Sequence, residues 1–283
     1  MGEPHRLVIV ELKGGTGNWL FQAFHGQAFA KRHGANLLFD DVVAMHGACR
    51  TGLLSLFAFI DRAKHPSSIQ ADVTVQETYC NIHTGVGLHD GAWPDACTVV
   101  RLVGFFQAVP TPAPYLNAFI DSLSFSTVEQ LEAAELVPDP EHTAFIHLRR
   151  GDYLAPGNCH LFHTVTKEYV EACVGRLPAR CAIVLFTNDV PWAKEQMWLF
   201  GERTLLIAAP EVCMNTTLAA MARCRFGIIS NSTFGAWGAL LAGRFHEAKV
   251  QMPVQWLVGH PTPTLPLHWT RVDNVTGTAI ASV

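Results

Sequence analysis

The chain has 283 residues, of which 49% are apolar and only 16% are charged, so it is long enough and apolar enough to form two packed domains. This composition excludes a disordered or polyelectrolyte chain. The formal net charge is −4 and no long run of Lys or Arg occurs, which excludes broad binding to nucleic acids or to membrane surfaces. A small anionic ligand stays compatible with these numbers, because a few aimed arginines suffice to bind one.

The cysteines and the first residues indicate the compartment. Eight cysteines are scattered without a Cys-x-x-Cys pair, a pattern typical of mostly buried, reduced thiols and not of a disulfide framework. The apolar run Leu7 to Val10 is too short for a signal peptide or a membrane span. We therefore expect a soluble, cytoplasmic protein, or a catalytic domain excised from a longer chain.

The first half of the chain begins with a strand, a glycine turn and a helix. Residues 7–10 predict a strand, Gly14 to Asn18 a tight turn, and residues 19–30 a helix that ends at basic residues before Gly34. Residues 44–98 show no clear pattern. The remaining predicted elements of this half are strands at 36–39 and 99–103 and a helix at 126–136 that begins with a capping box.

The segment Pro138-Asp139-Pro140 interrupts the pattern and predicts a domain boundary. We expect one domain at residues 1–138, with 250–283 as a candidate completion of it, and a second domain at 139–249. In the second domain, strands and helices alternate, which predicts an α/β fold with parallel strands and helical crossovers. The predicted strands are 144–147, 182–186 and 225–229, and the predicted helices are 167–176, 191–199, a helix following Asn215, and 233–242.

The segment His147 to Tyr153 carries two adjacent arginines directly after a predicted buried strand. Open α/β sheets bind ligands at the carboxyl ends of their strands, and guanidinium groups bind phosphate oxygens through paired hydrogen bonds. Asp152 is placed to hold one arginine, and Gly151 permits close approach of backbone. The alternative is a structural Arg–Asp ion pair at the end of a strand.

A second candidate site lies at Ser230 to Gly238, where a hydroxyl-rich turn again joins a strand to a helix. The free N–H groups and the dipole at a helix start favour an anion, and Ser232 and Thr233 add hydroxyl donors. The alternative is an ordinary helix cap at Asn231 or Ser232, and both interpretations can hold together.

Other motifs are missing or weak. The turn Gly14 to Asn18 lacks the third glycine of the dinucleotide fingerprint, since Leu20 stands there, and it also lacks the Lys-Ser/Thr of a P-loop. No Asp-x-Asp pair offers ligands for Mg²⁺ or Mn²⁺, and no Gly-x-Ser-x-Gly elbow occurs. Cys159, His160 and His163 form the tightest Cys/His group, and we do not expect a metal there. No metal and no other cofactor is therefore expected.

Taken together, these segments resemble the α-1,2-fucosyltransferase family related to the blood-group H enzymes. The family's His-x-Arg-Arg-Gly-Asp-Tyr is intact at His147 to Tyr153. Departures occur at Thr16 and Trp19 in the first motif and at Gly235 and Ala236 in the fifth. The matching segments, in chain order, are Gly14 to Gln22, Gly104 to Gln107, His147 to Tyr153, Phe186 to Asp189, Asn231 to Gly238 and Pro266 to Trp269.

The resemblance implies a GT-B fold, in which two Rossmann-like domains face each other across a cleft and the second holds most of the donor. It implies that His147 and Asp189 lie near the guanine or ribose and that Arg149 contacts the β-phosphate with support from Arg150. The implied catalytic residues are Arg149, Arg150, Asp152 and Asn18. The implied donor-binding residues are His147, Arg149, Asn188, Asp189, Asn231, Ser232, Thr233, Phe234, Gly15 and Gly17.

The implied reaction transfers L-fucose from GDP-β-L-fucose to a hydroxyl of a glycan with inversion, in α-1,2 linkage and without a metal. Its transition state resembles an oxocarbenium ion, so stabilising the departing GDP matters more than a strong base. Asp40, Asp41 and Asp152 are candidates for that base. The alternatives are a relative with another nucleotide sugar or linkage, or a binding protein without catalysis.

One position departs from the family where a base would be recognised. The family usually has an acidic residue seven places before the cysteine that matches Cys224, and this chain has Thr217. A carboxylate there would accept hydrogen bonds from guanine, which threonine cannot reproduce. Either a group such as Glu211 or Asn215 replaces it, or base recognition is looser or different.

Overall fold

The structure is a computed structural model that describes residues 6–40, 55–57, 69–77, 92–109, 115–209 and 211–280. The chain divides into two compact units. The first comprises Met1–Ser124 with Pro263–Leu265, and the second comprises Phe125–Thr262 with Pro266–Val283.

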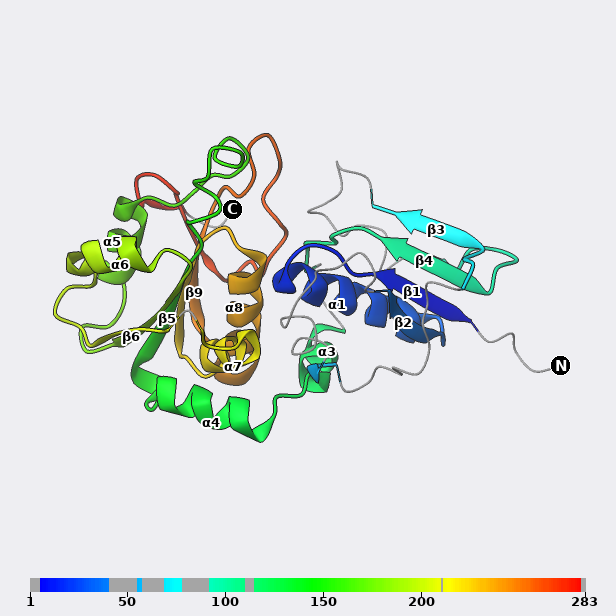
Figure 1. The fold of residues 1–283 in the computed structure, drawn as a ribbon, viewed down its shortest axis with the longest axis horizontal. Coiled ribbons are helices and arrows are strands. Elements are labelled where there is room, and N and C mark those ends of the chain that lie inside the picture. Colours follow the sequence, from blue (N-terminus) through cyan, green and yellow to red (C-terminus); the bar gives the residue numbers. More distant parts are fainter. Residues whose placement is uncertain are drawn as a thin grey trace. The chain divides into compact units, whose positions relative to one another are not determined.

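The first unit is built on a parallel sheet of four strands in the order β2-β1-β4-β3. The central strand β1 is buried because Val8, Ile9 and Val10 have no exposed surface. Helix α1 packs against β1 and β2 (Figure 1). Its apolar residues are buried over most of its length. The elements of this unit are β1 (Leu7–Glu11), α1 (Thr16–Arg32), β2 (Asn36–Asp40), β3 (Val73–Gln76), β4 (Val99–Val103) and α3 (Leu116–Ser122).

The second unit has a sheet of seven strands in the order β11-β10-β9-β8-β5-β6-β7, parallel except for the pair β10–β11. Helices α4, α7 and α8 lie together on one side of it, and α5 and α6 lie on the other (Figure 1). The strands are β5 (Thr143–Leu148), β6 (Ala182–Thr187), β7 (Leu205–Ile207), β8 (Phe226–Ile229), β9 (Lys249–Pro253), β10 (Thr270–Val272) and β11 (Ala279–Ile280). The helices are α4 (Thr127–Leu136), η3 (Pro140–His142), α5 (Lys167–Gly175), α6 (Val190–Glu195), η4 (Met197–Phe200), α7 (Met214–Ala222) and α8 (Thr233–His246).

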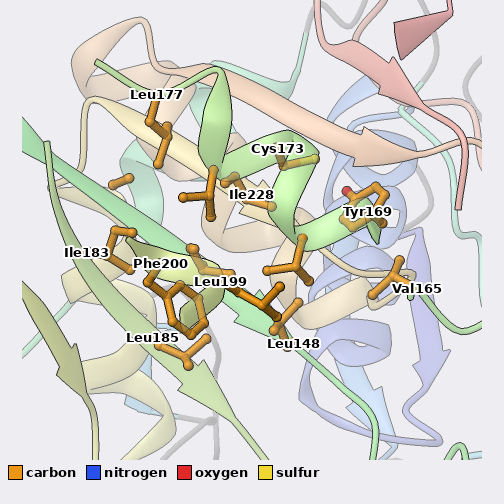
Figure 2. Packing of buried hydrophobic residues seen from close by; sticks show 14 of the residues in the cluster. Leu148, Val165, Tyr169, Cys173, Leu177, Ile183, Leu185, Leu199, Phe200 and Ile228 are labelled. Carbon is orange, nitrogen blue, oxygen red and sulfur yellow. The ribbon is translucent and has the colours of Figure 1, made fainter. Parts of the chain in front are cut away.

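An apolar cluster between β5, β6 and the helices α5 and η4 holds the second unit together (Figure 2). Ile146 and Leu148 of β5 and Leu185 of β6 have no exposed surface, and Phe200 of η4 is 1% exposed. Burial of such side chains stabilises the fold by about 1.5–3 kcal/mol each. Because β5 is fixed on both sides, the residues that follow it start from a rigid strand end.

Most predicted elements are confirmed, with shifts of a few residues at their ends. The helix predicted at 191–199 is instead two short pieces, α6 and η4, separated at Gln196. The chain also forms strands that the pattern did not predict, namely β3, β7, β9, β10 and β11.

The division between the units falls between Ser124 and Phe125. Helix α4 therefore groups with the second unit, because it packs against α7, whereas a boundary at Pro138 would assign it to the first domain. Of the tail after Gly259, Pro263–Leu265 belong to the first unit and the rest to the second. Across the ranges described, no helix is both long and apolar enough to cross a membrane.

Candidate active site

The two motifs singled out in the second half of the sequence follow adjacent strands. From β5 the chain proceeds to β6 and β7 on one side, and then returns to β8 on the other side of β5. This reversal makes the gap between β5 and β8 a switch point, where open α/β sheets bind ligands. Arg149 follows β5 and Ser230 follows β8, and the N–H of Arg149 donates to Ser230 Oγ at 3.0 Å.

The guanidinium of Arg149 is held by Asp152. Its Nε donates to Asp152 Oδ1 at 3.1 Å and its Nη2 to Oδ2 at 2.8 Å, a paired arrangement with both side chains half-exposed. The pKa of Arg149 is raised by this hydrogen bond. Burial raises the pKa of Asp152, but the hydrogen bonds and charge of Arg149 and the amide of Asn188 outweigh it, and the net shift is downward. The pair is therefore ionised, and Nη1 of Arg149 is left for an incoming oxygen.

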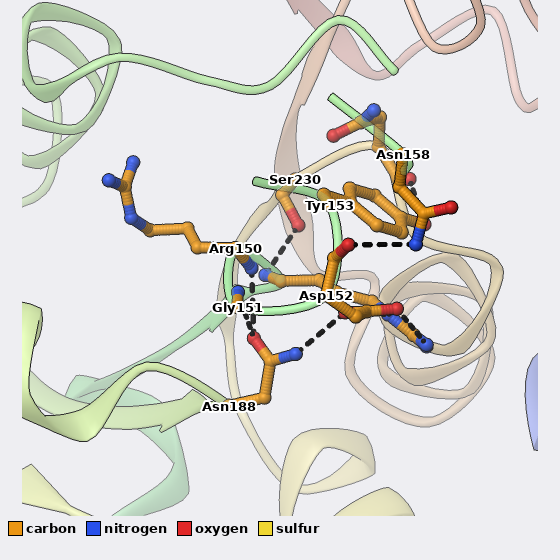
Figure 3. Close-up of polar contacts among 9 residues, drawn as sticks. Arg150, Gly151, Asp152, Tyr153, Asn158, Asn188 and Ser230 are labelled. Atoms are coloured by element: carbon orange, nitrogen blue, oxygen red, sulfur yellow. Dashed lines mark hydrogen bonds and ion pairs between the residues drawn. The ribbon is translucent and has the colours of Figure 1, made fainter. Parts of the chain in front are cut away.

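Asn188, which follows β6, organises the same loop (Figure 3). Its Oδ1 accepts from the N–H of Arg150 at 2.8 Å and of Gly151 at 3.1 Å, and its Nδ2 donates to Asp152 Oδ1 at 2.8 Å. Gly151 allows this approach, since a Cβ on it would lie 3.1 Å from the carbonyl oxygen of Asn188. One amide side chain thus fixes the backbone and the carboxylate that aims Arg149.

Arg150 points the other way and plays a different part. Its guanidinium lies 4.0 Å from the centre of the Trp192 ring, and its Nε lies 3.5 Å from Asp189 Oδ2. In Figure 3 its side chain extends away from Asp152 and Asn188. Asp189 also caps α6 by accepting from the N–H of Trp192. The two adjacent arginines therefore serve different neighbours.

The start of α8 presents polar groups without protein partners. Ser232 is the N-cap residue, but its side chain makes no capping bond, and its Oγ is buried without a partner in the structure. Asn231 is 3% exposed; its Nδ2 donates to the carbonyl of Trp256 at 2.9 Å, while its Oδ1 has no partner. Buried polar atoms normally have hydrogen-bond partners, so we expect a ligand or a water molecule to bind these two oxygens. Thr233 and Phe234 follow in the first turn and are half-buried.

His147 and Tyr153 line the same region. Burial, with a contribution from the charge of Arg149, lowers the pKa of His147 from 6.5 to about 3, so its imidazole is neutral. Its ring centre lies 5.5 Å from that of Phe234. Tyr153 donates from its hydroxyl to the carbonyl of Asn231 at 3.1 Å and stacks on Phe162 at 3.8 Å, which ties the arginine loop to the start of α8.

The glycine turn belongs to the first unit. Gly14 has φ of 76°, a conformation that favours glycine, and Gly15 is the N-cap of α1. Asn18 accepts from Gln107 Nε2 at 2.7 Å. Gly17 is buried at the start of α1. The predicted roles of Gly15, Gly17 and Asn18 toward a donor stay predictions.

Two of the three carboxylates predicted as base candidates are held by arginines. Asp40 is 7% exposed and pairs with Arg101 at 2.6 Å, and Asp152 pairs with Arg149. The third, Asp41, lies outside the described residues.

The family usually has an acidic residue at the position of Thr217. The amide of Asn215 does not directly replace it. Thr217 is 8% exposed on α7, and Asn215 Nδ2 donates to Glu129 Oε1 of α4 at 2.8 Å. Glu211 is exposed before the same helix. The described cysteines are free thiols, three of them buried, and Cys49 and Cys80 lie outside the described residues.

The family model of glycosyl transferase family 11 matches residues 104–250, which is just over half of the chain. The chain belongs to glycosyl transferase family 11. This confirms the family resemblance drawn from the sequence motifs, and the matched range contains the arginine loop, Asn188, and the start of α8.

This glycosyltransferase is similar to one curated relative and to several solved structures. It is 26% identical over 132 residues to the O-antigen biosynthesis glycosyltransferase WbnK of Escherichia coli. That match covers 44% of this chain and 43% of WbnK, so the chain spans less than half the length of this relative.

The solved structures share the fold. The α-1,6-fucosyltransferase NodZ, known from Bradyrhizobium, matches with a TM-score of 0.54 and 13% identity over 84% of this chain and 92% of NodZ. POFUT1 in complex with GDP matches with a TM-score of 0.55 and 13% identity over 88% of this chain and 99% of that one. The predicted GT-B-type α/β fold of this glycosyltransferase is thereby confirmed.

Within the described ranges, no group of three or more His, Cys, Asp or Glu side chains is arranged to hold a metal ion. Cys159 and His160 are exposed.

Proposed function

We propose that this family 11 glycosyltransferase transfers L-fucose from GDP-β-L-fucose to a hydroxyl of a glycan acceptor, with inversion and in α-1,2 linkage. The observation that carries the proposal is that the aimed guanidinium of Arg149 follows β5 while the unpartnered Ser232 Oγ, at the start of α8, follows the neighbouring strand β8. Both groups lie at the switch point between β5 and β8.

The chemistry of this site suits a diphosphate leaving group. In the transfer, the bond from C1 of fucose to the β-phosphate oxygen breaks, and its electron pair leaves with GDP. Arg149 and the free N–H groups of α8 stabilise the charge that develops on that oxygen. Because these groups are fixed before the donor binds, they need little rearrangement during the reaction.

Relatives support the choice of donor. The crystal structure of NodZ has been determined after soaking with GDP-fucose, and that of POFUT1 in complex with GDP. Both share the fold of this chain at low sequence identity. NodZ is an α-1,6-fucosyltransferase, so it does not support the α-1,2 linkage proposed here. That linkage is based on the family resemblance, and the linkage formed with an acceptor tests it.

The first prediction concerns Arg149. Arg149→Ala should weaken GDP binding by about 10- to 100-fold, as expected for the loss of a charge-assisted phosphate contact, without altering the fold. Isothermal titration calorimetry with GDP measures this, and thermal melting reports the fold. Arg180→Ala removes an exposed arginine of the same unit and serves as the matched control. Unchanged affinity for GDP in Arg149→Ala would contradict the role of Arg149.

The donor itself is tested with the wild-type chain. Calorimetry with GDP, UDP and ADP should show preference for GDP, followed by release of GDP from GDP-fucose in the presence of EDTA. The arginine and the helix N–H groups supply positive charge at the diphosphate, so we propose that the reaction needs no metal. Strict dependence on a divalent cation would contradict this part.

A second candidate is a relative that uses another nucleotide sugar, and one residue favours it. Thr217 stands where a carboxylate would accept hydrogen bonds from guanine, and the Asn215 amide is directed to Glu129. A clear preference for UDP in the same titrations would select this candidate.

A further inference from the structure

The turn that carries Arg149 is held by side chains that follow both neighbouring strands. After β8, Ser230 Oγ accepts from the N–H of Arg149 at 3.0 Å. After β6, Asn188 Oδ1 accepts from the N–H of Arg150 at 2.8 Å and from that of Gly151 at 3.1 Å. Because β8 and β6 both pair with β5, these contacts tie the turn to the middle of the sheet of the second unit.

The amide of Asn188 also reaches the side chain of Asp152. Its Nδ2 donates to Asp152 Oδ1 at 2.8 Å (Figure 3). The same oxygen accepts from Arg149 Nε at 3.1 Å, and Asp152 Oδ2 accepts from Arg149 Nη2 at 2.8 Å. The carboxylate is therefore bound by two donors, and the amide restricts its rotation while it holds the guanidinium.

These contacts require an amide at position 188. Two backbone N–H groups need an acceptor and the Asp152 carboxylate needs a donor, and asparagine supplies both on one short side chain. An aspartate at position 188 would still accept from the two N–H groups. It would, however, place a second carboxylate at hydrogen-bonding distance from Asp152, and like charges at that distance repel.

Arg149 depends on such guidance because its side chain is long and 40% exposed. An exposed arginine samples several rotamers, and ordering it when a ligand binds lowers the affinity. The Tyr153 ring lies 5.3 Å from its guanidinium carbon, and Asp152 supplies its paired hydrogen bonds. The neighbouring charges serve each other, since Arg150 Nε lies 3.5 Å from Asp189 Oδ2.

The groups around Asp152 keep their charge states between pH 5 and pH 8. Burial raises the pKa of Asp152, but Arg149 and the Asn188 amide outweigh it and the net shift is downward. The pKa of Arg149 is raised, and burial raises the pKa of Tyr153 to about 12. His147, on β5, has its pKa lowered to about 3 by burial and stays neutral. The orientation of Arg149 should therefore not change across this range.

We propose that Asn188 is the positioning residue that aims Arg149 at the diphosphate of the donor, acting through Asp152, an inference that rests on the proposed function. Asn188 exchanges no proton in the reaction. It fixes the carboxylate and the backbone of the turn before the donor binds, so that the guanidinium needs little further ordering.

The test compares Asn188→Asp and Asn188→Ala with the wild-type chain in calorimetric titrations with GDP at pH 8 and pH 5. Each affinity is divided by the wild-type affinity at the same pH, so that the protonation of GDP itself cancels. Asn158→Asp is the control for added charge, because Asn158 Nδ2 donates to the backbone carbonyl of Asp152 at 2.9 Å and not to its side chain. Thermal melting reports the fold of each variant.

Asn188→Asp should bind GDP about tenfold more weakly than the wild-type chain at pH 8, and within about threefold of it at pH 5. At pH 8 the two carboxylates repel each other, whereas at pH 5 one of them keeps a proton and donates it to the other, as the amide does. Asn188→Ala has no group to titrate and should lose about 3- to 10-fold at both pH values. Asn158→Asp should show no recovery at pH 5.

A second background separates orientation from charge. If Asn188→Asp acts through Asp152, it should weaken GDP binding in the wild-type chain but by less than about twofold in Asp152→Asn, where the new amide can donate to the new carboxylate. An effect of charge alone would weaken binding equally in both backgrounds, as is expected for Asn158→Asp.

A loss of affinity in Asn188→Asp that is the same at pH 8 and pH 5, or no loss at all, would overturn the role of Asn188 while leaving the proposed donor intact. Wild-type affinity in Asn188→Ala would overturn it as well, whether or not Asn188→Asp folds. Failure of the wild-type chain to bind GDP would overturn the proposed function and this inference together.

Discussion

At the scale of single residues, His147 shows how its environment sets its protonation state. Because burial and the charge of Arg149 lower the pKa of His147 from 6.5 to about 3, the folded imidazole stays neutral between pH 8 and pH 5. The unfolded chain gains a proton at this residue below pH 6.5, so the folded state loses relative stability as the pH falls. From pH 7 to pH 5 the loss from this group is roughly 1–2 kcal/mol.

This prediction is checked by denaturant unfolding at pH 7 and pH 5. His147→Gln should lose less stability between the two pH values than the wild-type chain. His160→Gln, at an exposed position in the same unit, should retain the wild-type difference. A His147 ring resonance that titrates between pH 8 and pH 5 in NMR spectra would contradict the neutral imidazole.

The sequence motifs predicted candidate site residues by chemical type but not by partner. Two arginines after a buried strand predicted a phosphate site, and the structure brings Arg149, Asp152 and Asn188 together there. The sequence could not show that Arg150 faces Trp192 instead, because adjacent residues share the same motif and differ only in direction.

At the scale of elements, glycines mark where strands and helices approach closely. A Cβ on Gly227 of β8 would lie 2.6 Å from the ring of Phe145, which has no exposed surface on β5. A Cβ on Gly238 of α8 would lie 2.5 Å from Met221 Cε, at the end of a flexible side chain, and 3.0 Å from Met221 Cβ. A Cβ on Gly243 of the same helix would meet nothing within 4 Å.

These three glycines give a graded prediction. Gly227→Ala should lower the free energy of unfolding by about 1–3 kcal/mol, since the buried ring cannot move away. Gly238→Ala should cost less, because Met221 can adjust and the helix gains roughly 1 kcal/mol in propensity. Gly243→Ala should stabilise by up to about 1 kcal/mol. Urea unfolding of the three variants tests the order, and equal effects would contradict it.

Strong periodicity decided which elements could be predicted. β1, α1, β5 and α8 have long apolar patterns with clear start or stop signals, and each forms at the expected place. β3 has only four residues with alternating burial, and β10 and β11 are shorter still, so their sequences carry too little pattern for recognition. Their positions depend on pairing with neighbouring strands that lie far away in the sequence, such as β4 for β3.

At the scale of the whole molecule, the division into two units distributes the proposed chemistry. The arginine loop, Asn188 and the start of α8 belong to the second unit, while Asn18 and the glycine turn belong to the first. Proline positions indicated a boundary near Pro138, but α4 packs against α7 and so groups with the residues that follow it. Such packing is a long-range contact that local breaker residues do not encode.

This distribution predicts that the second unit binds GDP without the first. A fragment of residues 125–283 contains Arg149, Asn188 and Ser232 together with the apolar cluster around β5, and compact units with their own core commonly fold alone. It should melt cooperatively and bind GDP within about tenfold of the affinity of the whole chain. The match is not expected to be complete, because Pro263–Leu265 lose their place in the first unit.

Circular dichroism and calorimetry on the fragment, with Arg149→Ala in the same fragment as control, measure this. A fragment that melts cooperatively but fails to bind GDP, when the whole chain binds it, would mean that Gly15, Gly17 or Asn18 carries an essential part of donor binding. A fragment that does not fold would contradict the independence of the second unit. Cooperative folding with retained GDP binding would place the diphosphate contacts in the second unit.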